Sequence, residues 1–261
     1  MRTRAARILL AFVVPAALTV IWDLLVRFSV LPQSQAASPW EVAVTLFRSV
    51  GSGLLLRHSM YSLARLCAGV SIGALAAIAF ALLVSSSRGS AVLLLPMTQL
   101  LAGVPVVLWM PFCVMIFGTD EAYKISLVGV GTFFLVQLFV IQALRDVHRH
   151  YVELADMYEK SRSARIRHLF LPASLPAMFT AVRAAFAAGW IVLFFVEFAT
   201  SYAGREGLGW FIADARHAGR IEQEFAGLIW LGVLAVTVDM AVARLQAAKV
   251  RWLDIAPRIE W

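Results

Sequence analysis

The sequence predicts an all-α integral membrane protein with six transmembrane helices in a single domain, 1–261. Of its 261 residues, 61% are apolar and 15% are charged, whereas soluble domains average roughly 45–50% apolar and about 25% charged residues. One hydrophobic core could not hide so much apolar surface, so lipid must cover the rest. A bilayer core of about 30 Å needs about 20 helical residues. Six apolar runs have the required length: 8–28, 61–84, 91–117, 122–144, 176–198 and 225–244.

The first run follows three arginines and could be mistaken for a secretory signal peptide. Its apolar stretch is longer than such peptides need, and Asp23 and Arg27 stand between it and the nearest cleavage-like site. We therefore expect an uncleaved first helix. The two charges are four residues apart, so we also expect them to neutralise each other.

Two short helices are predicted in the segments that follow the first and the fifth runs. Ser38-Pro39-Trp40-Glu41 has the residue types of a helix start, and Val44 and Phe47 then share a face with Trp40. The second helix is expected around 210–212, after a glycine-rich stretch. Both are expected to lie in the outer membrane interface.

The third run contains Pro96, Gly103, Pro105 and Pro111. A transmembrane helix can break only where protein or a water-filled cavity satisfies the freed backbone groups. We expect this segment to face the protein interior; a plain kinked helix is the alternative.

Lysine and arginine set the predicted orientation. Three lie before the first run, one is Arg88, six lie in 145–175 and four lie from 244 onward, fourteen in all, against six in the alternate segments. The positive-inside rule then places both termini in the cytoplasm. The longest cytoplasmic segment, 145–175, is predicted to form two short helices, with Leu154, Met157 and Tyr158 on one face. It is either a docking surface for a cytoplasmic partner or a solvated loop that packs on itself.

The residues of this segment resemble the EAA loop of ABC importer permeases. The matching residues are Glu153-Leu154-Ala155, Ser161, Phe170, Leu171-Pro172-Ala173 and Leu175-Pro176. With Ser38-Pro39, the prolines of the third run, Phe117-Gly118, Lys124-Ile125 and Gly207-Leu208-Gly209, the chain resembles the nitrate, sulfonate and taurine branch of type I permeases from about residue 31 to 252. Two residues depart from the pattern, since Leu154 replaces an alanine and Glu159 replaces a glycine.

The resemblance implies that this chain is the permease subunit of an ATP-driven importer of a small solute, an organic or inorganic anion such as a sulfonate, taurine or nitrate. It implies a homodimer in the bacterial inner membrane, an extracytoplasmic solute-binding protein, and separate cytoplasmic ATPase subunits that hold ATP and Mg. The residues that it assigns to ATPase coupling are Glu153, Leu154, Ala155, Asp156, Met157, Tyr158, Glu159 and Ser161.

No catalytic constellation stands out in the sequence. The chain lacks the glycine-rich phosphate loop that would bind ATP, and its five histidines have no metal-site spacing. Cys67 and Cys113 lie in apolar stretches and are expected to be buried thiols. We therefore expect no enzyme activity, no metal and no cofactor on this chain. The short basic clusters between apolar runs also argue against a nucleic-acid partner, because they suit membrane orientation better.

The candidates for the translocation path are Pro105, Pro111, Arg183 and Glu197. Arg183 lies inside the fifth run, where an isolated charge costs about 2.5–3.5 kcal/mol at a helix centre. It could attract an anionic solute, pair with lipid phosphates or have a structural partner. Arg65 lies near a helix end and is expected to extend toward the interface.

Two rival classes remain. A self-sufficient secondary transporter or channel would show inverted repeats or paired intramembrane charges. A membrane-embedded enzyme would need convergent His, Asp or Glu residues inside the spans.

Overall fold

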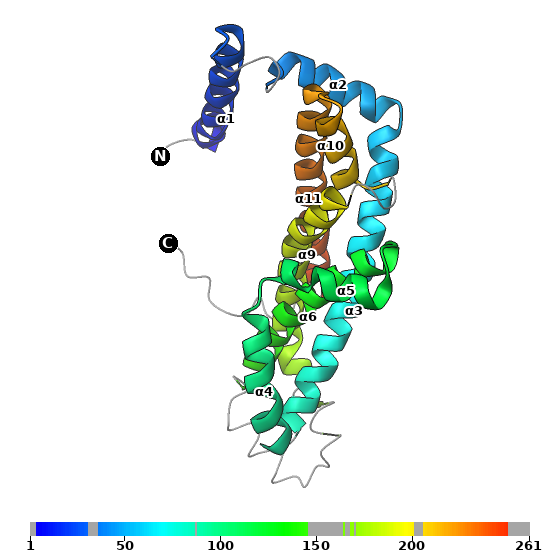
Figure 1. Cartoon of the computed structure of the whole chain (residues 1–261). Coiled ribbons are helices and arrows are strands. Elements are labelled where there is room, and N and C mark those ends of the chain that lie inside the picture. Colours follow the sequence, from blue (N-terminus) through cyan, green and yellow to red (C-terminus); the bar gives the residue numbers. More distant parts are fainter. Residues whose placement is uncertain are drawn as a thin grey trace. The chain divides into compact units, whose positions relative to one another are not determined.

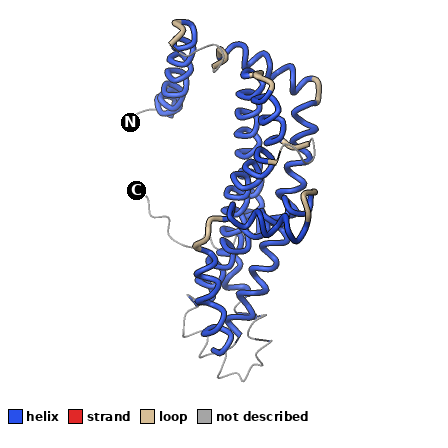
Figure 2. The backbone as a smooth tube through the Cα atoms, in the orientation of Figure 1, coloured by secondary structure: helices blue, strands red, loops and turns tan. Residues whose placement is uncertain are grey.

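The computed structural model describes residues 4–30, 36–86, 88–145, 164, 168–169, 171–200 and 206–249. Within them the chain is helical, with short connections and no strand (Figure 2). The main helices, labelled in Figure 1 where there is room, are α1 (Arg4–Arg27), α2 (Pro39–Gly51), α3 (Leu54–Ser86), α4 (Arg88–Ala102), the 3-10 helix η1 (Val106–Trp109), α5 (Met110–Phe117), α6 (Glu121–Arg145), α9 (Leu171–Ala199), α10 (Leu208–His217) and α11 (Ile221–Lys249).

Most of the predicted spans coincide with long apolar helices. In the described part of the chain, four helices are long and apolar enough to cross a membrane, namely α3, α6, α9 and α11. The stretch from α4 to α5 makes a fifth if its two bent halves count as one span. The first run is helical as α1, but it is not among these helices. The all-α membrane class is confirmed, and the count of six spans stays a prediction.

The third run is broken rather than kinked. Helix α4 ends at Ala102, and the halves of this run are bent by 104°. Pro105 carries an extended ψ of 129°, and its carbonyl accepts a hydrogen bond from the backbone N–H of Leu108 at 2.9 Å, which starts η1. A proline has no N–H and disfavours helical geometry in the residue before it, so Pro105 prevents α4 from continuing.

The chain divides into two compact units, one formed by residues 1–61 and 198–233 and the other by 62–197 and 234–261. In the first unit, α2 begins as predicted. The Ser38 side chain accepts a hydrogen bond from the Glu41 backbone N–H at 3.3 Å, and the Ser38 backbone N–H donates to the Glu41 carboxylate at 2.9 Å. The backbone and side-chain hydrogen bonds from Ser38 hold the pKa of Glu41 below its usual value.

The side of α2 that carries Val42 packs within the same unit, whereas Trp40 and Phe47 are exposed. Ala37, Val42 and Ala226 form a buried cluster, and the rings of Trp22 and Phe225 lie 5.5 Å apart. Asp23 and Arg27 form the expected ion pair on α1.

The second short helix, α10, is also confirmed, and it is held close to α3. The backbone N–H of Gly207 donates to Nδ1 of His58 at 3.1 Å, and the His58 ring stacks on Trp210 at 5.6 Å. Nearby, Arg57 pairs with Glu206, and this hydrogen bond lowers the pKa of the Glu206 carboxyl. These contacts fix the start of α10 against one face of α3.

In the second unit, α3 and α6 approach closely because glycines face each other. A Cβ placed on Gly73 would lie 2.3 Å from the carbonyl oxygen of Gly129, and one on Gly69 would lie 2.7 Å from the side chain of Val128. Small residues of this kind let transmembrane helices pack backbone against backbone. The contact fixes α6, which forms a wall of the candidate site.

Candidate functional site

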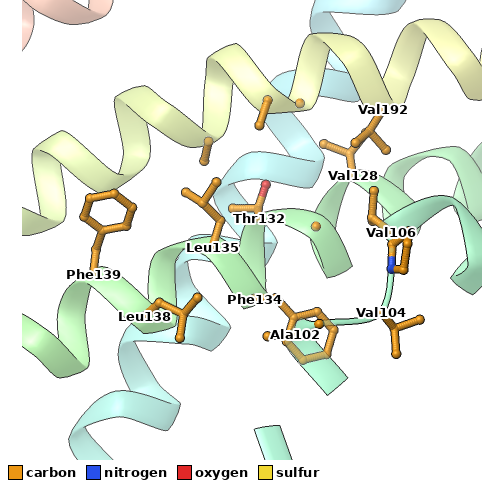
Figure 3. A pocket seen from close by; sticks show the side chains of 16 residues that line it. Ala102, Val104, Val106, Val128, Thr132, Phe134, Leu135, Leu138, Phe139 and Val192 are labelled. Carbon is orange, nitrogen blue, oxygen red and sulfur yellow. The ribbon is translucent and has the colours of Figure 1, made fainter. Parts of the chain in front are cut away.

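A cavity of about 470 Å³ lies in the second unit beside the break in the third run. Its walls come from the connection after α4, from η1, from α6 and from α9. Figure 3 shows Val104 on the connection, Val106 at the start of η1, Thr132 and Leu135 on α6 and Val192 on α9. The lining residues are Ala102, Gly103, Val104, Pro105, Val106, Val128, Gly131, Thr132, Phe134, Leu135, Leu138, Phe139, Ala185, Ala188, Gly189 and Val192. This volume suits a small organic molecule.

Small residues on two facing helices keep this space open. Gly131 on α6 and Ala185, Ala188 and Gly189 on α9 all line it. A Cβ on Gly131 would lie 3.1 Å from the side chain of Val106 at the start of η1. The break at Pro105 also shapes the cavity, because it places the residues between α4 and η1 in the cavity wall.

Thr132 provides the only side chain with a hydrogen-bonding group among these lining residues. It is 3% exposed, and its Oγ1 has no hydrogen-bond partner among the described residues. A buried hydroxyl without a partner costs roughly 1–3 kcal/mol. A guest in the cavity that bonds to this hydroxyl would recover that cost.

A second polar feature lies at the first turn of α6 and is satisfied internally. Arg65 on α3 is 3% exposed and donates to two carboxylates. Its Nη1 lies 2.6 Å from Glu197 on α9, and its Nη2 lies 2.7 Å from Glu121. Ser62 donates to the buried Glu197 carboxylate at 2.8 Å, and Lys124, 2% exposed, lies 3.3 Å from Glu121. Two cations and two carboxylates thus balance, and the cluster ties α3, α6 and α9 together.

This cluster corrects one expectation. Arg65 does not extend toward the interface, because Glu121 and Glu197 supply buried partners for its guanidinium. Local sequence patterns do not reveal the cluster, because its pairings span 56 and 132 residues of chain. The available signal was that all four charged residues of the cluster lie in the second, fourth and fifth runs or directly before one of them.

Arg183 also has a structural partner. Its Nε and Nη2 each lie 2.7 Å from a carboxylate oxygen of Asp239, and both side chains are nearly half exposed. This bidentate ion pair joins α9 to α11. A hydrogen bond from Gln246 to Thr180 at 3.1 Å joins the same two helices.

Of the four path candidates, Pro105 lines the cavity, whereas Pro111 lies at the start of α5 and Arg183 and Glu197 take part in the ion pairs above. The predicted coupling residues Glu153, Leu154, Ala155, Asp156, Met157, Tyr158, Glu159 and Ser161 lie outside the described residues.

The two cysteines differ from each other. Cys113 is buried as predicted, but Cys67 is exposed on α3, so that expectation was wrong. In a membrane helix the residues that face lipid are apolar as well as the buried ones. An apolar stretch of sequence therefore does not show that a cysteine within it is buried. Among the described residues, no three His, Cys, Asp or Glu side chains lie close enough to hold a metal ion.

A helical membrane unit with a broken span beside a cavity is compatible with many transporters, and a family match decides between them. Residues 69–253 match the family described as the binding-protein-dependent transport system inner membrane component. The chain belongs to this family. It is therefore a transport permease of the multi-pass membrane class, as the sequence analysis predicted.

Individual relatives give the branch of the family. Over 238 residues the permease is 28% identical to SsuC of Bacillus subtilis, named for the transport of aliphatic sulfonates, and the match covers 91% of this chain and 85% of SsuC. It is 27% identical over 199 residues to the bicarbonate transport system permease protein CmpB of Synechococcus elongatus, covering 76% and 69% of the two chains.

A solved structure supports the fold. A chain of the inward-facing MetNI methionine ABC transporter matches with a TM-score of 0.63 at 19% sequence identity, covering 75% of this chain and 95% of the other. The permease thus has the all-α fold of type I importer permeases.

Proposed function

We propose that this permease is the membrane subunit of an ATP-driven importer for a small anion such as a sulfonate, taurine, nitrate or bicarbonate. The observation that carries the proposal is the family match, together with two relatives named for the transport of anions, aliphatic sulfonates and bicarbonate. The chain has no phosphate-binding loop, so ATP and Mg would be bound by a separate ATPase subunit.

The proposed path for the solute runs through the cavity beside the broken span. Apolar walls with one unpaired hydroxyl, that of Thr132, would bind a small solute weakly enough to release it. Pro105 shapes this wall, and Pro111 begins the second half of the broken span. Arg183 and Glu197 act on the path through their ion pairs, which hold the surrounding helices in place.

Energy from ATP would enter through the EAA-like segment. The residues 153–161 are proposed to insert into a surface cleft of the ATPase, with Leu154 and Tyr158 as apolar contacts. Differential affinity of ATP for the closed ATPase pair would then bias the permease between its two states. Two permease copies and two ATPase subunits complete the proposed assembly, and a solute-binding protein would deliver the anion to the extracytoplasmic side.

The coupling assignment has a direct test. Leu154→Arg and Tyr158→Arg should leave membrane insertion intact but abolish copurification of the ATPase or solute-stimulated ATP hydrolysis. Ser201→Arg, in another polar segment, is the matched control and should change neither measurement. Normal complexes and normal transport in both Leu154→Arg and Tyr158→Arg would contradict the docking assignment.

Orientation can be tested with single cysteines. In a background lacking Cys67 and Cys113, Ser163→Cys should react with an impermeant reagent only after the cells are opened, and Ser201→Cys should react in intact cells. Labelling of Ser163→Cys in intact cells would contradict the cytoplasmic position of 145–175.

Energy source separates this proposal from the rival secondary transporter or channel. Proteoliposomes with the permease, its ATPase and its binding protein should accumulate one of the four anions only when ATP is present. Accumulation by the permease alone, driven by an ion gradient, would favour the rival.

A further inference from the structure

A second, smaller cavity lies on α6 beyond the first one, and five of its eight lining residues have polar side chains, the other three being Leu95, Leu138 and Ile141. It has a volume of about 70 Å³ and is lined by side chains from α4 and α6. Thr98 and Gln99 come from α4, and Gln137, Gln142 and Arg145 come from the last turns of α6. Four of these five residues carry hydrogen-bond donors that do not depend on pH, and the fifth is a permanent cation.

Gln137 is the residue that indicates a ligand. It is 1% exposed, and neither its Nε2 nor its Oε1 has a hydrogen-bond partner among the described residues. Buried side-chain amides are nearly always paired, because a donor and an acceptor left unpaired in an apolar interior lose their hydration without compensation. A leucine would fill a similar volume without that loss. The unpaired amide therefore points to a group that enters the cavity.

The chemistry of the lining favours an oxyanion. Glutamine amides and a guanidinium donate hydrogen bonds, and the guanidinium adds positive charge at the end of α6. The Thr98 hydroxyl already donates to the backbone carbonyl of Leu94 at 3.0 Å. No carboxylate is among the lining residues of this cavity. The volume of about 70 Å³ exceeds that of a water molecule, whose share of the liquid is about 30 Å³. It suits the head of a sulfonate, or a nitrate or bicarbonate ion.

Leu138 lies between this cavity and the larger one, because it lines both. The larger cavity is lined by apolar side chains apart from Thr132, whereas the smaller one has both polar and apolar lining residues. Along α6, Thr132 faces the first and Gln137 the second. An anion that passes Leu138 would exchange an apolar wall for a set of donors.

From these observations we infer that the Gln137 cavity is an oxyanion-binding site. The transported anion binds there after it leaves the larger cavity. This inference rests on the proposed function, since that function supplies the anion and the direction of passage. With the predicted orientation, the site lies toward the cytoplasmic end of α6.

Binding can be measured apart from transport. The transporter assembled from the full chain and its ATPase is titrated with methanesulfonate, nitrate and bicarbonate, and its Tm is recorded, because a ligand that binds the folded state raises Tm. Dimethyl sulfone has the size of methanesulfonate without its charge and serves as the neutral control probe. At least one anion should raise Tm at concentrations where dimethyl sulfone does not.

Variants of the lining assign that shift to the site. Gln137→Leu should raise the half-saturating anion concentration about tenfold or more, as expected for one hydrogen bond to a charged group. Gln137→Glu, which places a carboxylate in the cavity, should abolish the shift. Gln99→Leu, on the α4 side, should weaken it in the same direction. Gln246→Leu on α11 removes a glutamine that bonds to Thr180 outside the cavity and should leave the shift unchanged.

Several results would overturn the inference. The first is the absence of an anion-specific Tm shift in the wild type, and the second is an unchanged shift in Gln137→Leu and Gln99→Leu. The third is uptake at the wild-type rate in Gln137→Glu. Any of these results would mean that the cavity holds water only. ATP-driven uptake by the wild type separates this failure from that of the proposed function. If uptake is normal and the Tm shift is the same with and without Gln137, only the proposed binding site is wrong. If the Tm shift depends on Gln137 but ATP drives no uptake, only the proposed ATP-driven transport is wrong.

Discussion

At the first turn of α6 both charged side chains have partners, whereas farther along the same helix two buried polar side chains have none among the described residues. Glu121 and Lys124 belong to a balanced cluster with Arg65 and Glu197. Thr132 and Gln137 each face a cavity. The difference separates two uses of polar groups in a membrane protein. Those bonded to one another hold helices together, and those left unpaired beside a cavity are available to a solute.

The largest expected effect comes from breaking the partnered region. Arg65→Met removes the guanidinium from the buried Glu197 carboxylate, to which Ser62 still donates, and breaking a buried ion pair in this way costs about 3–5 kcal/mol. We expect a large loss of folded protein in detergent and a lower Tm.

Arg57→Met is the matched control for that change. It removes an arginine from the same helix, but Arg57 is 64% exposed in its pair with Glu206. Exposed pairs contribute little, so its Tm should fall much less. Equal losses in the two variants would mean that the Arg65 cluster does not hold the helices together.

A smaller effect is expected from separating α3 and α6 without replacing a polar side chain. Gly73→Ala places a Cβ against the backbone of Gly129, and overpacking of this kind costs typically about 1–3 kcal/mol. Gly232→Ala on α11 meets open space and should be neutral or slightly stabilising. Thermal unfolding of both proteins measures the contrast. A neutral Gly73→Ala would show that the close packing of these helices is not needed.

The capping box of α2 consists of hydrogen-bonded polar groups at an exposed site. Breaking it should lower the stability less than Gly73→Ala does. Ser38→Ala should cost about 1 kcal/mol. The folded-state pKa of Glu41 is lowered, so the stability that its carboxylate contributes is present above the unfolded pKa of about 4.3 and is lost as pH falls through the folded value. The Tm difference between wild type and Glu41→Gln should thus vanish in acid. A difference that persists below that pKa would contradict the role of the charge.

The unpaired region should show almost no stability effect and a clear functional one. Thr132→Val keeps the shape and removes a hydroxyl that has no partner in the described structure, so Tm should stay the same or rise slightly. Uptake of the transported anion should fall severalfold. Thr180→Val, which removes a bonded and exposed hydroxyl on α9, is the control and should leave uptake unchanged. Normal uptake in Thr132→Val would remove Thr132 from the path.

Local sequence patterns were enough for the helices but not for the contacts between them. The run 122–144 differs by one residue at each end from α6, and the Ser38 start of α2 was correct. These features depend on neighbours within one turn of helix. The pairing of Arg65 with Glu197 depends on packing between distant helices and could not be deduced from one sequence. Thr132 was hidden in an apolar run, because only the fold shows that its hydroxyl has no partner.

The central claim is that the cavity beside the broken span carries the solute, and cysteine accessibility tests it most directly. In a background lacking Cys67 and Cys113, Thr132→Cys is placed in the assembled transporter and treated with a small thiol reagent. The account predicts that this position is labelled, that the transported anion slows the labelling, and that ATP changes its rate. Absence of labelling in every state, or a rate that neither anion nor ATP alters, would contradict the claim.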